Sequence, residues 1–276
     1  MQQLLTHTAG FSYGFNPNDT IDKLYNKANL WESKDLDEFT KKISEIPLKF
    51  EPGNRWHYSI AVDLTGLIVE RLSNMSLDEY FYKKIFKPLG MNDTSFAVPH
   101  SKINRLTELF QREVDNSYIS VDPASDQSSW AKPITLESGG GGLVSTAADY
   151  FKFAEMLRGL GTFEGTRVLG RKTAEYMMRN HLPGNSDLTN MGQPIFSETS
   201  YDGIGFSLGG SVVVDAAKAK ALCSEGEFAW GGVASTAFWV DRAEGVVVVF
   251  LTQLLPSSSY PIRREIRSLV YQSLVG

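Results

Sequence analysis

The sequence predicts a mixed α/β protein, with an antiparallel sheet near its C-terminus and helices before and after that sheet. The last quarter of the chain contains β-branched and aromatic runs separated by short polar turns. Connections this short suit antiparallel neighbours, because parallel strands need crossovers of a dozen residues or more. Apolar residues recur at the helical period in earlier segments and again after the last run. A helix in that final position normally packs on the sheet.

The helices are predicted from apolar periodicity and from the residues that begin or end them. Ser59 is a plausible cap for a helix whose apolar residues recur at i, i+4, i+7, i+8 and i+12. Ser145 or Thr146, with Asp149 three residues after Thr146, resembles a capping box. Pro47 and Pro88 are expected to stop the helices before them. The expected helices are 35–46, 59–72, 77–86, 147–158, 171–179 and one after Pro261.

The strands are predicted from runs of β-branched and aromatic residues between polar turns. The expected strands are 211–215, 228–230, 237–241 and 246–253. The segments 92–135 and 183–203 have weak periodicity and are expected to be mostly loop.

Composition excludes several classes of protein. The chain has 276 residues, which gives a prior of one or two domains. Its 27 Lys and Arg against 32 Asp and Glu give a net charge of -5 without a basic block, so neither nucleic acid nor a membrane surface is an expected partner. No apolar run approaches the length of a transmembrane helix, and a cytoplasmic location is weakly favoured.

Metal and disulfide chemistry are not expected. Cys223 is the single cysteine, so it cannot form an internal disulfide. The four histidines are scattered and form no metal-binding motif. They are His7, His57, His100 and His181.

One Ser-x-x-Lys sequence is present, and we interpret it as coincidental. A serine nucleophile activated by this lysine needs the two side chains one helical turn apart. Pro133 directly follows Lys132 and disfavours a helical backbone there, so Ser129 is not expected to be a nucleophile. The chain also lacks a Gly-x-Ser-x-Gly elbow, which argues against an α/β-hydrolase.

Two glycine-rich segments suggest close backbone packing. Gly139 to Gly142 lacks the Lys-Ser/Thr of a phosphate-binding P-loop, and we interpret it as a backbone crossing that needs close packing or positive φ. Gly231 and Gly232 follow Trp230 in a predicted strand, where glycine indicates a bulge or the close approach of a ligand.

Together, five segments resemble the serine β-lactamase/transpeptidase-like family, and most closely its class C β-lactamase-like carboxylesterases, called family VIII esterases. The resemblance spans nearly the whole chain, with the segments in the family's order. They are Leu4-Leu5-Thr6-His7-Thr8-Ala9-Gly10, Tyr58-Ser59-Ile60-Ala61-Val62-Asp63, Pro88-Leu89-Gly90-Met91, Gly140-Gly141-Gly142-Leu143-Val144-Ser145-Thr146 and Trp230-Gly231-Gly232.

The resemblance implies roles for the matching residues. Tyr58 matches the family's catalytic tyrosine, which relays protons with a lysine. The backbone N–H of Val233 would be an oxyanion-hole donor, while Gly231 and Gly232 let the substrate carbonyl approach the strand. His7 matches no catalytic histidine and is expected to cap or pack.

The resemblance also favours an esterase over a lactamase. The family's lactamases and penicillin-binding proteins carry asparagine two residues after the tyrosine, where this chain has Ile60. They carry Lys-Thr-Gly where it has Trp230-Gly231-Gly232, and an aromatic wall suits an apolar acyl or alcohol group. The implied substrate is a small-molecule, short-acyl ester, and no cofactor is implied.

The family fold is a β-lactamase/transpeptidase-like antiparallel sheet flanked by helices, joined to a mainly helical subdomain. We expect one partial domain over residues 1–276, with the helical subdomain at approximately 15–175 and the sheet region at approximately 200–276. The family's Ser-x-x-Lys nucleophile motif lies upstream of the segment that opens this chain. We therefore expect the nucleophile, the first strands and an N-terminal partner segment to lie outside these residues. The sequence does not define the oligomeric state.

Two alternatives remain from the sequence. One is a β-lactamase or penicillin-binding D-alanyl peptidase. The other is a non-catalytic binding protein of this fold, because the nucleophile motif is not in the chain.

Overall fold

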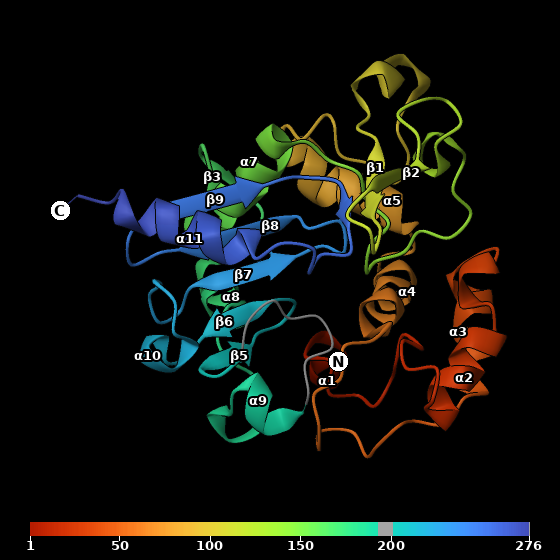
Figure 1. The fold of residues 1–276 in the computed structure, drawn as a ribbon, viewed down its shortest axis with the longest axis horizontal. Coiled ribbons are helices and arrows are strands. Elements are labelled where there is room, and N and C mark those ends of the chain that lie inside the picture. Colours follow the sequence, from red (N-terminus) through yellow and green to blue (C-terminus); the bar gives the residue numbers. More distant parts are fainter. Residues whose placement is uncertain (193–200, 276) are drawn as a thin grey trace.

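The computed structural model describes residues 1–192 and 201–275, and Figure 1 shows its helices and strands. The α-helices are α1 (Gln2–Leu5), α2 (Thr20–Lys27), α3 (Leu36–Ser44), α4 (Ala61–Ser73), α5 (Leu77–Phe81), α6 (Lys87–Leu89), α7 (Ala147–Arg158), α8 (Arg171–Met177), α9 (Leu188–Met191), α10 (Ala216–Ala219) and α11 (Ile262–Gln272). The shorter helical turns are η1 (Leu30–Glu32), η2 (Tyr82–Phe86), η3 (His100–Arg105), η4 (Ser129–Ala131) and η5 (Pro183–Asn185). The strands are β1 (Leu109–Arg112), β2 (Tyr118–Asp122), β3 (Thr162–Phe163), β4 (Thr166–Arg167), β5 (Ile204–Phe206), β6 (Ser211–Val213), β7 (Phe228–Gly231), β8 (Ala237–Asp241), β9 (Val246–Phe250) and β10 (Leu254–Leu255).

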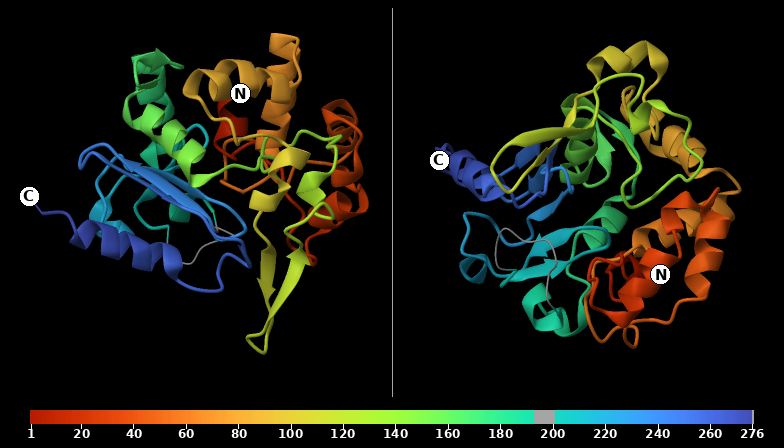
Figure 2. Two further views of the ribbon diagram at one scale, coloured as in Figure 1. Left: turned by 90° about the horizontal axis from the view of Figure 1, so that it is seen from above. Right: turned by 45° about the vertical axis from the view of Figure 1, so that its right-hand side comes forward.

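A five-stranded antiparallel sheet forms the C-terminal part of the protein. Its strands follow one another in the order β5-β6-β7-β8-β9, so the predicted meander is confirmed. α7 covers one face of this sheet and α11 covers the other (Figure 2). The predicted fold class, an antiparallel sheet flanked by helices with a mainly helical part beside it, is confirmed.

The segment 183–203 is less loop-like than expected. It contains the short turn η5 and the helix α9, and edge strand β5 follows it directly, with Ile204 paired to Val213. The remainder of that prediction, residues 193–200, lies outside the described residues.

Polar contacts attach α11 to the sheet. Arg267 forms an ion pair with the buried carboxylate of Glu227, and its guanidinium lies 4.7 Å from the ring centroid of Trp239. The Tyr271 hydroxyl lies 2.6 Å from carboxylate oxygens of both Glu227 and Asp241. The predicted packing of the last helix on the sheet is therefore confirmed.

Three hydrophobic clusters fill the interior. The first joins α6, α7 and α8 to β7 and β8, and the second lies within the N-terminal helices. The third lies between these parts, because it contains residues of the first 60 together with residues of the sheet. Its buried members are Trp56, Leu182, Leu188 and Phe206, with Tyr58 and Trp230 packed against them.

The N-terminal helices differ from prediction at their starts. Asp35 caps α3 by accepting a hydrogen bond from the Glu38 amide. Ser59 does not cap α4, because that helix begins at Ala61 and the Ser59 side chain lies beside His7. The predicted cap was therefore wrong.

The prediction that the helix beginning at Leu77 stops before Pro88 was wrong. A π-helical turn over Tyr82–Phe86 follows α5, and α6 begins at Lys87 with Pro88 in its first turn. Proline is tolerated there because first-turn amides have no acceptor within the helix. The chain then leaves the helix at Gly90, whose φ is 65°.

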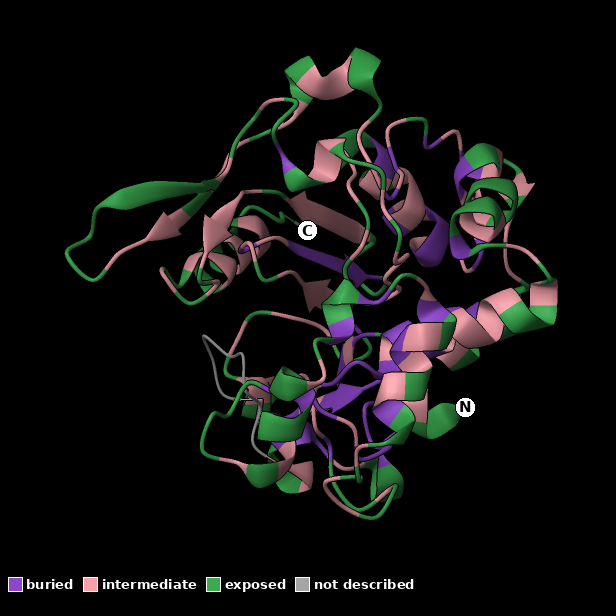
Figure 3. Cartoon of the chain, turned by 90° about the vertical axis from the view of Figure 1, so that its right-hand side faces the viewer, coloured by how far each residue is buried: buried purple, intermediate pink, exposed green. Residues whose placement is uncertain are grey.

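A β-hairpin interrupts the segment 92–135, which was predicted to be mostly loop. β1 and β2 pair antiparallel and project from the body of the protein (Figure 2). β2 is exposed along most of its length (Figure 3). β1 also pairs in parallel with β10, and Phe110 lies opposite Leu254. Sequence periodicity gave no indication of this pairing with a distant segment.

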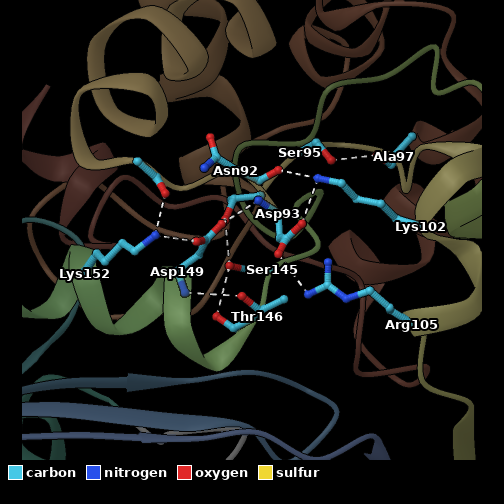
Figure 4. A network of polar contacts seen from close by, with 12 residues as sticks. Asn92, Asp93, Ser95, Ala97, Lys102, Arg105, Ser145, Thr146, Asp149 and Lys152 are labelled. Atoms are coloured by element: carbon cyan, nitrogen blue, oxygen red, sulfur yellow. Dashed lines mark hydrogen bonds and ion pairs between the residues drawn. The ribbon is translucent and has the colours of Figure 1, made fainter.

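Asp149 connects the start of α7 to the segment before the hairpin (Figure 4). Its carboxylate accepts hydrogen bonds from the Asp93 amide at 2.6 Å and from the Thr94 hydroxyl at 3.2 Å. Thr146 accepts from the Asp149 amide at 3.2 Å, so Thr146 is the cap of the two predicted candidates, Ser145 and Thr146.

β9 is an edge strand of the five-stranded sheet, and each of its residues is partly exposed. A hollow of about 630 Å³ lies between this strand and α7, lined mainly by apolar side chains such as Phe151, Val247 and Val249. In the described parts of the chain, no helix has the length and apolar character needed to span a membrane.

Candidate active site

Hydrogen bonds between two segments place Tyr58. The His57 amide donates to the His7 carbonyl at 2.9 Å, and the Ile60 amide donates to the Ser12 carbonyl at 3.4 Å. The Ser12 hydroxyl also lies 3.2 Å from Nε2 of His57. Tyr58 is therefore held between fixed neighbours, immediately before α4.

His7 supports this arrangement as a buried, neutral ring. Its side chain is 2% exposed, and its Nδ1 accepts a hydrogen bond from the Ser59 amide at 3.3 Å. Burial, followed by the proximity of His57, lowers the pKa of His7 to about 3. The expectation that His7 packs in the interior is confirmed.

Tyr58 and Trp230 meet although they are 172 positions apart in the sequence. Their ring centroids are 5.5 Å apart, and the indole also makes an edge contact with Phe206 at 5.1 Å. The Tyr58 side chain has hydrogen bonds with Trp230 and with Tyr13, whose ring centroid is 5.1 Å away. The structure thus brings two of the predicted site residues together and adds Tyr13, which the sequence did not indicate.

The pKa of Tyr58 reflects opposing effects. Burial raises this pKa, while the hydrogen bonds from Trp230 and Tyr13 lower it and the nearby Asp63 raises it. The net direction is upward from the ordinary tyrosine value. Tyr58 is therefore a protonated phenol at neutral pH in this chain.

Asp63 lies near Tyr13 and Tyr58 and binds the glycine segment Gly139 to Gly142. One of its carboxylate oxygens accepts from the Ser138 hydroxyl at 2.5 Å and from the Gly140 amide at 3.0 Å. Its other oxygen, Oδ2, is buried and has no hydrogen-bond partner among the described residues. Burial raises the pKa of Asp63, and the bonds from Ser138 and Gly140 lower it by less.

The tetraglycine packs closely, as one of its two interpretations predicted. A Cβ on Gly140 would lie 2.8 Å from Oδ2 of Asp63 and 2.9 Å from the Tyr13 hydroxyl. A Cβ on Gly142 would lie 2.7 Å from the Ser138 carbonyl, whereas one on Gly141 would meet nothing within 4 Å. The alternative reading, positive φ, does not apply to these glycines.

Close contacts also surround the glycines at the end of β7 and in the turn that follows. A Cβ on Gly231 would lie 2.7 Å from the Thr236 carbonyl and 3.0 Å from the guanidinium of Arg263. A Cβ on Gly232 would lie 2.5 Å from the Thr236 hydroxyl. Close packing against the backbone therefore favours glycine at position 231, whereas a Cβ at position 232 would meet only the Thr236 side chain.

Val233 follows these glycines on an exposed turn, with 68% of its surface accessible. Within the described ranges, no group accepts a hydrogen bond from its amide. A cavity of about 190 Å³ lies beside this turn and is lined in part by Tyr150, Trp230 and Phe238. The arrangement offers a hydrogen-bond donor on this turn and, beside the partly buried Tyr58, an apolar wall formed by Trp230.

The single Ser-x-x-Lys does not form a helical pair. Ser129 lies in the short turn η4, and Lys132 has an extended backbone with φ -95° and ψ 153°. The two residues therefore do not occupy adjacent helical turns, as Pro133 led us to expect.

The chain was compared with known families, sequences and structures. The sequence profile of the Beta-lactamase family matches residues 1–272. Protein Rv1367c of Mycobacterium tuberculosis is 30% identical over 263 residues, which cover 94% of this chain and 63% of that protein. Esterase EstB of Burkholderia gladioli is 28% identical over 292 residues, covering 98% of this chain and 69% of that protein.

Among solved structures, EstCE1, a hydrolase with promiscuous acyltransferase activity, superimposes with a TM-score of 0.80 at 25% identity. The match covers 98% of this chain and 71% of that one. The chain thus spans about two thirds of the length of these similar proteins.

Proposed function

The chain belongs to the Beta-lactamase family, and from this premise we propose that the protein hydrolyses short-acyl carboxylic esters through a serine acyl-enzyme. EstB is named an esterase and EstCE1 a hydrolase, and both align over 98% of this chain. These two proteins are 28% and 25% identical to this chain, and their names support hydrolysis as the reaction class.

The contact between Tyr58 and Trp230 is the observation that carries the proposal. A general acid–base group placed beside an apolar wall suits an uncharged acyl or alcohol group. The nearby guanidinium of Arg263 is engaged with the carbonyls of Gly232 and Thr236. This pattern favours an ester over the charged carboxylate of a β-lactam.

In the proposed reaction, a serine hydroxyl attacks the ester carbonyl and Tyr58 relays its proton to the leaving alcohol. The Val233 amide donates to the oxyanion of the tetrahedral intermediate. Water then hydrolyses the acyl-serine, which regenerates the hydroxyl and releases the acid. We assign the serine and its lysine to polypeptide outside residues 1–276, because the one Ser-x-x-Lys within them has Lys132 in an extended conformation.

The experiment compares the complete protein that carries this sequence with its Ser129→Ala variant. Both are assayed with p-nitrophenyl esters of increasing acyl length and with a chromogenic cephalosporin, and both are treated with a serine-reactive phosphonate followed by peptide mass spectrometry. We expect equal ester hydrolysis by the two proteins, a preference for short acyl chains, little cephalosporin turnover, and one labelled serine other than Ser129.

Each remaining outcome contradicts part of the proposal. Labelling of Ser129 would overturn the assignment of the nucleophile. Faster turnover of the cephalosporin than of any ester would favour a lactamase. Adding a small alcohol tests acyl transfer, because EstCE1 is described as a promiscuous acyltransferase. Transfer that exceeds hydrolysis would change the proposed reaction.

A further inference from the structure

Two side chains donate hydrogen bonds to the phenol oxygen of Tyr58. The indole of Trp230 is a donor only, so its hydrogen bond with Tyr58 has the tyrosine oxygen as acceptor. The second hydrogen bond joins the hydroxyls of Tyr13 and Tyr58. For Tyr58 to relay protons, its own hydrogen must point towards the reacting groups, so Tyr13 is the donor in this bond. Both rings pack on Tyr58, with centroid distances of 5.5 Å and 5.1 Å.

Two accepted hydrogen bonds fix where the Tyr58 proton lies. A phenol oxygen has one hydrogen and two acceptor sites. With both acceptor sites filled by Trp230 and Tyr13, the hydroxyl hydrogen must point in the remaining direction. When the proton leaves, the new lone pair occupies that same direction, so uptake and release follow one path.

We propose that Trp230 and Tyr13 are positioning residues that hold the Tyr58 oxygen through two donated hydrogen bonds and stabilise its anion without a lysine on β7. This inference rests on the proposed function for its catalytic meaning. It gives Trp230 a polar role in addition to its apolar surface. Hydrogen bonds to a charged group are stronger than those to a neutral one, so both donors favour the phenolate over the phenol.

Two other titratable groups near Tyr58, His7 and Asp63, do not supply such donors. His7 lies 4.7 Å from Tyr58 between ring centroids and is neutral, because its pKa is lowered to about 3. Asp63 raises the pKa of Tyr58 and therefore opposes ionisation. The hydrogen bonds from Trp230 and Tyr13 therefore oppose the effect of burial on the pKa of Tyr58.

The test removes each donor and keeps its ring. Trp230→Phe deletes the indole N–H, and Tyr13→Phe deletes the hydroxyl. Trp239→Phe on β8 is the matched control, since the Trp239 indole N–H has no acceptor within the described residues. The protein is labelled with 3-fluorotyrosine, whose phenol is more acidic than that of tyrosine, and the Tyr58 signal is assigned by its loss in Tyr58→Phe.

Fluorine NMR titration then measures the pKa of Tyr58 in each variant. We expect each deletion to raise this pKa by about one unit, a tenfold change in the ionisation constant, and the double variant to raise it further. A signal that no longer titrates also counts as a rise. The Trp239→Phe protein should titrate like the parent.

An unchanged or lowered pKa in both deletion variants, with unchanged circular dichroism, would overturn the inference. The titration needs no substrate, so it is independent of whether the protein hydrolyses esters. In the complete protein, we also expect Trp230→Phe to lower kcat about tenfold with little change in KM. If the pKa rises but no ester is hydrolysed, the proposed function fails and the hydrogen-bond inference stands.

Discussion

The guanidinium of Arg263 on α11 donates a 2.7 Å hydrogen bond from Nη2 to the carbonyl oxygen of Gly232. That carbonyl belongs to the same peptide group as the amide of Val233. The carbonyl also accepts from the Ser235 amide at 3.2 Å, so two donors hold this peptide plane. A charged donor on the carbonyl polarises the N–H on the opposite side. Arg263 therefore orients and strengthens the proposed oxyanion donor.

Replacing Arg263 with methionine should weaken catalysis in the complete protein. The Gly232–Val233 peptide loses its charged donor, so we expect kcat to fall by about 10-fold or more, up to the ~10²–10³-fold cost of losing an oxyanion donor. KM should change little. Arg264→Met is the control, because Arg264 is an exposed neighbour on the same helix. Equal kcat values for the two variants would exclude this role of Arg263.

Replacing Tyr58 with phenylalanine should lower kcat by about 10²–10⁴-fold, the usual contribution of general acid–base catalysis. The variant keeps the ring contacts and loses only the hydroxyl, so the free energy of unfolding should fall by no more than about 1–2 kcal/mol. Trp230→Ala removes the wall as well, and KM for longer acyl esters should rise. Retention of more than about a tenth of kcat in Tyr58→Phe would show that Tyr58 is not the proton relay.

Gly140→Ala and Gly141→Ala form a matched pair within one loop. The first adds a methyl group 2.8 Å from Oδ2 of Asp63, whereas the second adds it to open space. We expect Gly140→Ala to lower the free energy of unfolding by about 1–3 kcal/mol and Gly141→Ala to change it by less than about 0.5 kcal/mol. Chemical denaturation measures both. Equal stability of the two variants would mean that the loop moves freely away from Asp63.

Replacing Val248 with lysine should reduce self-association of the chain. β9 is a partly exposed, valine-rich edge strand, and such edges pair with other chains. A charge on the edge blocks that pairing at a cost of about 1 kcal/mol or less at a partly exposed site. Sedimentation velocity at several concentrations compares the two proteins. A parent chain that stays monomeric throughout would contradict the prediction.

The stability of the protein should fall below pH 6.5 because of His7. The unfolded chain takes up a proton near pH 6.5, while the folded chain keeps His7 neutral down to its pKa of about 3. Stability is therefore fully present above pH 6.5 and falls by about 1.4 kcal/mol per pH unit as the pH decreases towards 3.

His7→Asn removes this titration and keeps an acceptor for the Ser59 amide. Asparagine also tolerates the left-handed backbone of residue 7, whose φ is 54°. Urea denaturation measures the free energy of unfolding between pH 6.5 and 5. The slope of this free energy against pH should be smaller in the variant, by the equivalent of about one bound proton. The same slope in both proteins would exclude His7 as the source.

Local signals predicted those parts of the fold whose stability is local. The Thr146 cap and the strand Ala237–Asp241 were predicted with their observed bounds. The β1–β2 hairpin was not, because β1 depends on a partner strand more than 140 positions away. Pro88 was misread as a stop, because sequence rules did not include the π-helical turn that allows a new helix to begin at Lys87.

The candidate site divides in the same way. Tyr58 and Trp230 were found because each lies in a segment with a family pattern. Tyr13 and Arg263 were not found, because they act on residues 45 and 31 positions away and belong to no motif of their own. Only packing between distant segments makes them part of the site.

The position of Tyr58 and Trp230 at the third hydrophobic cluster also has a consequence for synthesis. The ribosome makes the Tyr58 segment first, and the strands β5 to β9 follow within residues 204–250. Each of these strands pairs with its neighbour in the sequence, so the sheet can form as soon as it is released. The contact between the two aromatic residues can form only after both parts exist, so we expect it to form late in folding. Quenching of Trp230 fluorescence by the closing cluster would then time the completion of the site.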